Sequence, residues 1–322
     1  MNSPRYVHLR LHSEYSVTDG IVRVGDAVKR AASDGMPALA MTDLGNLFGL
    51  VKFYMATRSK GVKAIAGADV WINNPESPDD AYRLLLLARN RAGYQQLCEL
   101  LTKAYMVEGR RDRAEIRREW FSEIGSDGLL ALSGAHLGDV GEALINGNFD
   151  IAGERAQAWE AIFPGAFYLE VQRYGQPQQE AIVQQTADLA GQLSLPLVAT
   201  HPIQFMNRED FRAHEARVCI AEGYVLGDVR RPKTYTEEQY FKTQAEMSEL
   251  FADLPEALEN SLEIAKRCNI ELTLGKNFLP NFPTPEGMTL DDFLVAEAKA
   301  GLEVRLEQLY PDPEERLKRR PE

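Results

Sequence analysis

Short apolar runs alternate along the chain with longer amphipathic stretches. Runs of strand length, rich in Leu, Val and Ala, occur at residues 6–11, 38–42, 64–72, 82–88, 129–133, 166–171 and 195–200. Between most of them, apolar positions recur at the spacing of one helix face, over residues 25–33, 47–59, 91–105, 148–162 and 178–193. Repeated strand and helix units predict an α/β fold rich in parallel strands. Their number favours a barrel over an open sheet.

The pattern changes after residue 210, where helical periodicity continues without strands. It covers residues 211–221, 246–251, 255–268 and 290–309. The Pro-rich stretch LPNFPTPEG (279–287) precedes the last of these helices and is the best candidate for a domain boundary. We therefore expect one domain over residues 1–280, and a linker with the start of another domain over residues 281–322. Because the sequence stops on the charged run EERLKRRPE, we expect it to be part of a longer protein.

Composition limits the classes of partner and location. The 322 residues are 44% hydrophobic and 26% charged, as in ordinary globular proteins. A formal net charge of -12 argues against binding of nucleic acid by this chain alone, because such binding depends on contacts with phosphates. Cys98, Cys219 and Cys268 lie far apart without a CxxC spacing, which is typical of free thiols in a reducing compartment. The sequence lacks an apolar run of about 20 residues. We expect a cytoplasmic protein without a membrane partner.

Candidate chemistry lies at the ends of the predicted strands. The stretch VHLRLHSEYSVTDG (7–20) alternates apolar side chains with His8, Arg10 and His12, and Asp19 follows. Histidine and aspartate are common metal ligands, yet Arg10 lies on the same polar face and its permanent positive charge repels a divalent cation. In a barrel, the strand ends and the loops that follow them carry the chemistry. The other ends read TDLGN (42–46), ADV (68–70), SGAH (133–136) and ATHPIQF (199–205).

Several stretches resemble a known family in their order along the chain. HLRLHSEYSVTDG, ALAMTDLGNLFGLVKFY, GVKAIAGADV and FYLEVQRYG resemble the N-terminal region of the bacterial replicative DNA polymerase III alpha-subunit family, of the proteobacterial type. The resemblance covers essentially the whole chain. It implies a PHP (polymerase and histidinol phosphatase) domain, which is a distorted seven-stranded (β/α) barrel, followed by a helical segment that begins the polymerase core.

Metal-binding members of this family hold metal ions at the strand ends and hydrolyse phosphoesters. Their ligands are an HxH pair, a loop Asp, the His of a TDH motif, a Glu, a further His, a Cys and an Asp-x-His pair. Transferred by resemblance, these positions are here Arg10, His12, Asp19, Leu44, Asp69, Arg83, Ala135, Pro202 and Gln204. Only His12 and Asp19 are unchanged.

The altered positions predict that the metal site is lost. Leucine, alanine and proline have no side-chain donor, and arginine does not act as a ligand, so we expect no bound metal. The alternative is one weakly held metal on His12 and Asp19. For His8, His136, His201 and His214, a hydrogen-bonded histidine is the preferred interpretation over a metal ligand.

Arg10 and Arg83 can replace the charge of the lost metals. If Asp19, Asp43 and Asp69 converge at the barrel mouth, they repel one another, and two guanidinium groups would offset that repulsion. The alternative is that both arginines reach solvent. Because Arg83 lies near the start of its strand, it reaches the mouth only if that strand runs antiparallel.

The resemblance also implies a function. The full-length chain would be a DNA-directed DNA polymerase that uses Mg²⁺ and acts on DNA with the other holoenzyme subunits. Its catalytic aspartates would lie outside these residues, so we expect no catalytic residue and no cofactor here. The domain would be a structural module on which the proofreading exonuclease (epsilon) subunit docks. The alternative is a residual metal-dependent phosphoesterase, either a pyrophosphatase or a 3'-5' exonuclease.

Overall fold

The computed structural model describes residues 6–107, 113–277 and 279–320, and the chain divides into two compact units. The first unit is Met1–Leu272 and the second is Thr273–Glu322. Among the described residues, none of the helices is both long enough and apolar enough to span a bilayer.

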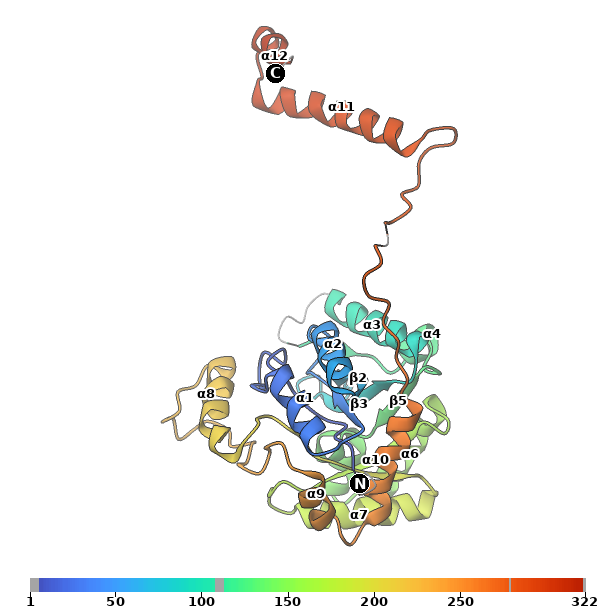
Figure 1. Cartoon of the computed structure of the whole chain (residues 1–322), viewed down its shortest axis with the longest axis vertical. Coiled ribbons are helices and arrows are strands. Elements are labelled where there is room, and N and C mark those ends of the chain that lie inside the picture. The colour runs from blue at the N-terminus through green and yellow to red at the C-terminus, as the bar shows by residue number, and fades with distance from the viewer. Residues whose placement is uncertain (1–5, 108–112, 278, 321–322) are drawn as a thin grey trace. The chain divides into compact units, whose positions relative to one another are not determined.

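A curled, mixed seven-stranded sheet forms the centre of the first unit (Figure 1). Its strands are β1 (Ala38–Met41), β2 (Lys63–Ile72), β3 (Tyr82–Ala88), β4 (Glu115–Ile116), β5 (Leu129–Leu132), β6 (Phe167–Gln172) and β7 (Leu197–Thr200). The order across the sheet is β1-β2-β3-β5-β6-β7, and β4 pairs with β2. Strand β3 is antiparallel to both β2 and β5, and the other pairs are parallel.

The N-terminal residues close the curled sheet into a distorted barrel. The Ala40 amide donates to the His8 carbonyl oxygen at 2.9 Å, and the His12 amide donates to the Ile203 carbonyl oxygen at 3.0 Å. The segment that contains His8 and His12 therefore lies between β1 and the chain that follows β7. The strand predicted at residues 6–11 is extended, but it pairs through an isolated bridge between Leu11 and Ile203 and is not a regular strand.

Helices surround the sheet, and most coincide with the predicted periodic stretches. They are α1 (Val24–Ser33), α2 (Leu50–Lys60), α3 (Arg91–Met106), α4 (Trp120–Ile124), α5 (Asp139–Ile145), α6 (Phe149–Ile162), α7 (Gln179–Leu193), α8 (Phe211–Glu222), α9 (Gln244–Leu250) and α10 (Pro255–Arg267). The sequence did not predict α4 or β4, whose five and two residues are too short to show a period, and it also missed α5.

The prediction that the strands are mainly parallel needs one correction, at β3. Residues 73–81 connect β2 to β3 without a helix, so the chain turns back beside β2 instead of crossing over the sheet. Arg83 consequently pairs with Trp71 across the two strands, and Asp69 pairs with Leu85. This antiparallel pairing brings Arg83 to the same end of the barrel as Asp69.

The second unit contains α11 (Leu290–Leu309) and α12 (Pro313–Arg319). Helix α11 begins after Thr289, whose hydroxyl accepts from the Asp292 amide at 3.1 Å, the usual N-cap arrangement. Among the apolar side chains of α11, Leu294 is 67% exposed and Leu306 is 6% exposed. Our expectation that residues 281–322 begin a polymerase core stays a prediction.

Candidate functional site

Most of the positions singled out by the resemblance line one cavity of about 680 Å³ at the barrel mouth. They are Arg10, His12, Asp19, Leu44, Asp69, Arg83, Pro202 and Gln204. Ala135 lies beside this cavity, since its neighbours Gly134 and His136 are in the lining, and Ala135 itself lines a smaller cavity of about 150 Å³. The structure therefore gathers distant parts of the chain into one site.

Arg10 is buried and lies between two carboxylates. Its Nε and Nη2 donate to Oε1 and Oε2 of Glu170, both at 3.0 Å, and its Nη1 donates to Oδ2 of Asp69. Bidentate contact of a guanidinium with a carboxylate is among the stronger charged hydrogen bonds in proteins. Only 4% of Arg10 is exposed, so the interpretation that it reaches solvent is wrong.

Asp69, at the centre of β2, is shared by three cationic side chains. Arg83 donates to it through Nε at 3.1 Å and through Nη2, and His12 Nε2 lies 3.2 Å from Oδ2. Burial alone would raise the pKa of Asp69, but Arg10 and Arg83 outweigh burial and hold the pKa well below its ordinary value. The Arg83 guanidinium also stacks on Trp71, 4.5 Å from the ring centroid.

His12 completes the cluster as a third cation. Its Nδ1 lies 2.8 Å from Oδ2 of Asp19, so both ring nitrogens face carboxylates. Burial alone would lower the pKa of His12, but Asp19 and Asp69 outweigh it and raise the pKa to about 9. The pKa of Asp19 falls to about 2 because the charge of His12 outweighs burial. At neutral pH His12 is an imidazolium.

One expectation about the carboxylates was wrong, namely that Asp43 joins Asp19 and Asp69 in one cluster. Asp19 pairs with His12. Asp43 does not line the cavity but accepts from the amide and the hydroxyl of Ser13 at 2.6 and 2.9 Å, and burial raises its pKa to about 6. The acidic partner that the sequence reasoning missed is Glu170 in β6, which is 1% exposed.

A sequence signal for Glu170 existed. It is the charged residue within the buried run FYLEVQ, and a carboxylate in such a run requires partners. Besides Arg10, its partners are the Gly134 amide and Gln172 Nε2, both at 3.0 Å, and the Thr200 hydroxyl. The cluster thus holds three cations, Arg10, Arg83 and His12, against three carboxylates, Asp19, Asp69 and Glu170.

The residues at the candidate metal positions do not fit a metal ion. Arg10 and Arg83 both donate to the Asp69 carboxylate, and Leu44, Ala135 and Pro202 carry no side-chain donor for a metal. Gln204 Oε1 is a buried acceptor without a hydrogen-bond partner among the described residues, but one amide oxygen is too few for a hard cation, which takes about six oxygens. Over those residues, no group of three or more His, Cys, Asp or Glu has a metal-binding arrangement.

Comparison with known proteins identifies the family. The PHP domain family model matches residues 8–174, about half of the chain. The chain belongs to the PHP family. It is 54% identical, over its whole length, to DNA polymerase III subunit alpha of Neisseria meningitidis and 48% identical to that of Escherichia coli strain K12. It spans 28% of the length of each of these relatives.

The solved structures that match this chain are less similar to it. An amidohydrolase from Chromobacterium violaceum matches 66% of this chain, and 96% of its own, at 15% identity with a TM-score of 0.44.

The first unit, Met1–Leu272, is called the PHP unit below, and its other histidines each have a hydrogen-bond partner. His8 and His201 bind the carbonyl oxygens of Lys242 and Tyr240 at 2.7 and 2.9 Å, His136 binds the Tyr174 hydroxyl at 2.9 Å, and His214 binds the Asp19 carbonyl oxygen at 2.8 Å. Burial lowers the pKa of His8 and of His136 to about 4, so both are neutral at physiological pH.

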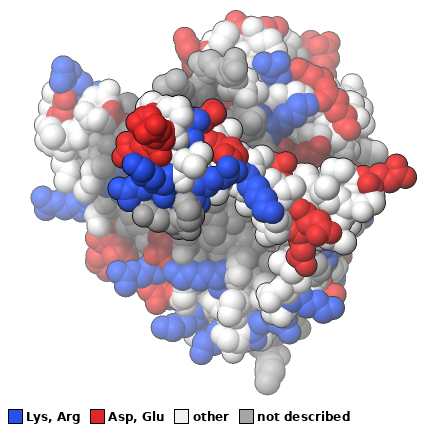
Figure 2. Space-filling view, turned by 90° about the horizontal axis from the view of Figure 1, so that it is seen from above, with Lys and Arg blue, Asp and Glu red and all other residues white. Residues whose placement is uncertain are grey.

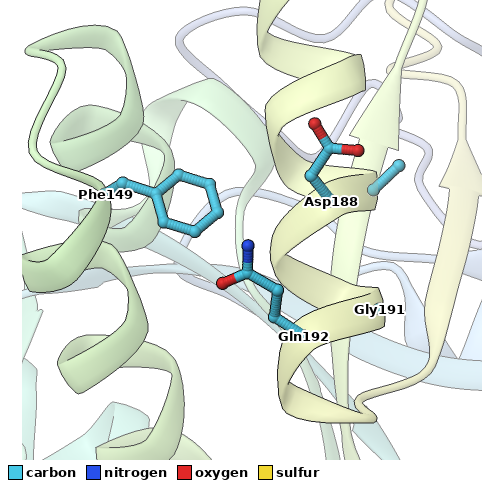
Figure 3. A pocket seen from close by; sticks show the side chains of 5 residues that line it. Phe149, Asp188, Gly191 and Gln192 are labelled. Carbon is cyan, nitrogen blue, oxygen red and sulfur yellow. The ribbon is translucent and has the colours of Figure 1, made fainter.

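A second large cavity, of about 640 Å³, lies between α6 and α7. Figure 3 shows Phe149 on α6 facing Asp188 and Gln192 on α7. Asp188 accepts from Gln184 one turn earlier at 3.0 Å. This cavity shares no lining residue with the candidate site.

Proposed function

We propose that this PHP unit is a structural and docking module of a replicative DNA polymerase and hydrolyses no phosphoester itself. The observation that carries the proposal is that Arg10 and Arg83, at two positions where the resemblance implies metal ligands, both pair with Asp69, at a third such position. Metal-dependent hydrolysis needs a cation that activates water or clamps oxygens. Here arginine nitrogens occupy the Asp69 carboxylate, which would otherwise help to hold that cation.

The relatives support a proposal for the role of the whole protein. Relatives named DNA polymerase III subunit alpha match this chain from end to end over 28% of their length. We infer that the full-length protein is a cytoplasmic DNA-directed DNA polymerase. In that protein, Mg²⁺ and the catalytic carboxylates belong to other domains, and contact with DNA and the remaining holoenzyme subunits is made through the longer chain.

Metal content tests the loss of hydrolase function. The purified chain is dialysed without chelator, and its content of zinc, manganese, iron and magnesium is measured by mass spectrometry. The same preparation is assayed for hydrolysis of pyrophosphate and of a 3'-labelled oligonucleotide. We expect well below one equivalent of each metal and no hydrolysis. About one equivalent retained, with hydrolysis lost in His12→Ala, would favour the residual phosphoesterase instead.

Docking is tested by titration with the proofreading exonuclease subunit of the same organism. We expect saturable binding by calorimetry and co-elution in gel filtration, with weak binding of single-stranded DNA because the chain is acidic. Absence of heat and of co-elution would refute the docking role.

A further inference from the structure

A segment that follows the last strand of the PHP unit lines one side of the barrel mouth. We use the name cap for this segment, which consists of α8 and the loop 223–235. The cap contributes to the cavity lining through Val218, Ala221, Glu222, Lys233, Thr234 and Tyr235. The cap stands at the left of the unit in Figure 1, and the left edge of Figure 2 projects from the remaining surface in the same place.

The helix and the loop of the cap hold together as one body. Arg231 in the loop donates to the carboxylate of Glu215 on α8, and its Nε donates to the Leu226 carbonyl oxygen at 3.3 Å. Only 14% of the Arg231 side chain is exposed, so this ion pair is well enclosed. The Tyr224 amide donates to the Cys219 carbonyl oxygen at 2.9 Å where the helix ends.

Little apolar burial attaches the cap to the rest of the unit. The buried residues of α8 are His214, Val218 and Cys219, three of its twelve. Ile220 on α8 is 77% exposed and Val229 in the loop is 93% exposed, so these apolar side chains do not anchor the cap. Segments with few buried apolar contacts open at a lower free energy than the whole domain.

One end of the cap is fixed to the body of the unit. His214 binds the carbonyl oxygen of Asp19 at 2.8 Å, and its ring lies 5.3 Å from the ring of Phe205, measured between centroids. Phe205 is 0% exposed, and its ring also lies 5.9 Å from that of Phe211, the first residue of α8. We use the name root for His214 and Phe211.

The other end of the cap is held by two polar contacts beside the mouth. The Tyr235 hydroxyl donates to the Asp19 carboxylate at 3.4 Å, and Gln176 Nε2 donates to the Thr234 carbonyl oxygen at 2.7 Å. We use the name latch for these two contacts. Burial, helped by the charge of Asp19, raises the pKa of Tyr235 well above its ordinary value, so the hydroxyl keeps the proton that it donates.

We propose that the cap is a lid, which rotates as one body about the root and opens the barrel mouth when the latch breaks. The inference goes beyond the proposed function and does not depend on docking. In the closed position the cap keeps water from the charge pairs around Asp19 and Asp69, which strengthens them. In the open position the cavity is fully accessible to solvent and small solutes. Because Asp19 contacts both Tyr235 and His12, the lid is coupled to the charge cluster.

Distances between spin labels test this movement. One label is attached through Val229→Cys on the cap and the other through Leu137→Cys, which lines the cavity from the body of the unit. Cys98, which is less buried than the other native cysteines, is replaced by serine. A second pair, Met55→Cys with Leu137→Cys, reports on the body alone. Distance distributions are measured by pulsed electron paramagnetic resonance.

The labelled chains are compared with and without Tyr235→Phe, which removes one contact of the latch. The matched control is Tyr168→Phe, which removes a hydroxyl that accepts from Arg267 at 2.7 Å and does not line the cavity. Because one hydrogen bond contributes about 0.5–1.5 kcal/mol, we expect a longer cap-to-body distance whose fraction grows about threefold or more in Tyr235→Phe. The control and the body-only distances should match the parent chain.

Three results would overturn the proposal. The first is a single cap-to-body distance that stays unchanged even when Gln176→Ala is combined with Tyr235→Phe, since the latch is then fully broken. The second is an equal response to Tyr168→Phe, which would leave the latch without a specific role. The third is a change of the body-only distance in Tyr235→Phe, which would mean that the whole unit loosens instead of the cap.

Discussion

At the scale of single residues, an arginine at a metal-ligand position gives a buried carboxylate a guanidinium partner in place of a metal ion. A guanidinium keeps its charge at every accessible pH and offers five donors in a fixed plane. Arg10 uses this geometry to contact Asp69 and Glu170 together, and Arg83 approaches Asp69 from β3. Arg10 and Arg83 thus balance carboxylate charges that a bound cation would otherwise balance.

Removal of Arg10 is expected to destabilise the fold strongly. Arg10→Ala leaves Asp69 and Glu170 buried with fewer partners, and breaking a buried pair from one side costs about 3–5 kcal/mol. Urea unfolding at neutral pH measures the loss. The matched control is Lys29→Ala on α1, where the side chain is 69% exposed. A loss below about 0.5 kcal/mol for Arg10→Ala, the range of an ordinary surface site, would contradict the charge-balancing role.

The charge on His12 predicts a pH dependence of stability. The folded pKa of about 9 lies above the ordinary value of 6.5, so the stabilising contribution is complete below pH 6.5 and is lost as pH rises through 9. The free energy of unfolding should fall by up to roughly 3 kcal/mol across this window. In His12→Gln the fall should disappear. Parallel stability curves of wild type and His12→Gln between pH 6.5 and 9 would show that the cluster does not hold a protonated His12.

At the scale of elements, close backbone contacts position the strands that carry the cluster. Helix α3 crosses the start of β5 at Gly93, where an added Cβ would lie 1.8 Å from the Gly128 carbonyl oxygen. Leu97 and Leu100 of α3 and Leu85 and Leu87 of β3 belong to the same buried core. The close approach of α3 to Gly128, which Gly93 allows, therefore helps to position β3 and the Arg83 side chain that β3 carries.

A substitution at Gly93 tests this packing. Gly93→Ala should lower the free energy of unfolding by about 2 kcal/mol or more, because backbone must move to admit the methyl group. Gly191→Ala, in α7, is the matched control, since its Cβ would meet nothing within 4 Å. That control should be neutral or stabilising by about 0.5–1 kcal/mol. Equal effects at the two glycines, measured by urea unfolding, would refute the packing account.

Periodicity predicted the long elements well and the small ones poorly. Helix α11 spans Leu290–Leu309, the range that the pattern indicated, because twenty residues carry several turns. The two-residue strand β4 has no period to detect, and the antiparallel direction of β3 depends on a connection that no local pattern specifies.

The candidate site was only partly predictable for a related reason. Arg10, His12 and Asp69 belong to stretches that the sequence analysis assigned to strand ends, and the fold class brings such stretches together, although Asp69 lies inside β2. Glu170 was missed because no family ligand position corresponded to it. Asp43 was misplaced because its hydrogen bonds to Ser13, thirty residues away in sequence, cannot be read from spacing.

At the scale of the whole molecule, the division into two units separates the charge cluster from the C-terminal helices. The residues that form the cluster lie in Met1–Leu272. The last segment of that unit contributes to its core, since Cys268 is 1% exposed and Ile270 is 8% exposed. Residues beyond Leu272 belong to the second unit.

Truncation tests that division. A chain that ends at Leu272 should unfold cooperatively with a free energy within about 0.5 kcal/mol of the longer chain, since no residue of the first unit's core clusters is removed. A chain that ends at Arg267 loses Cys268 and Ile270 and should be weaker by about 2 kcal/mol or more. Equal loss in both truncations would mean that residues after Leu272 stabilise the first unit.

A double-mutant cycle on Arg10 and Glu170 tests the central claim most directly. Urea unfolding is measured for wild type, Arg10→Ala, Glu170→Gln and the double variant, and the coupling free energy is the part of the loss that the two changes share. The bidentate contact predicts a coupling of about 2 kcal/mol or more, because each side chain is the buried partner of the other. Additive losses, with a coupling below about 0.5 kcal/mol, would contradict a cluster held together by charge pairing.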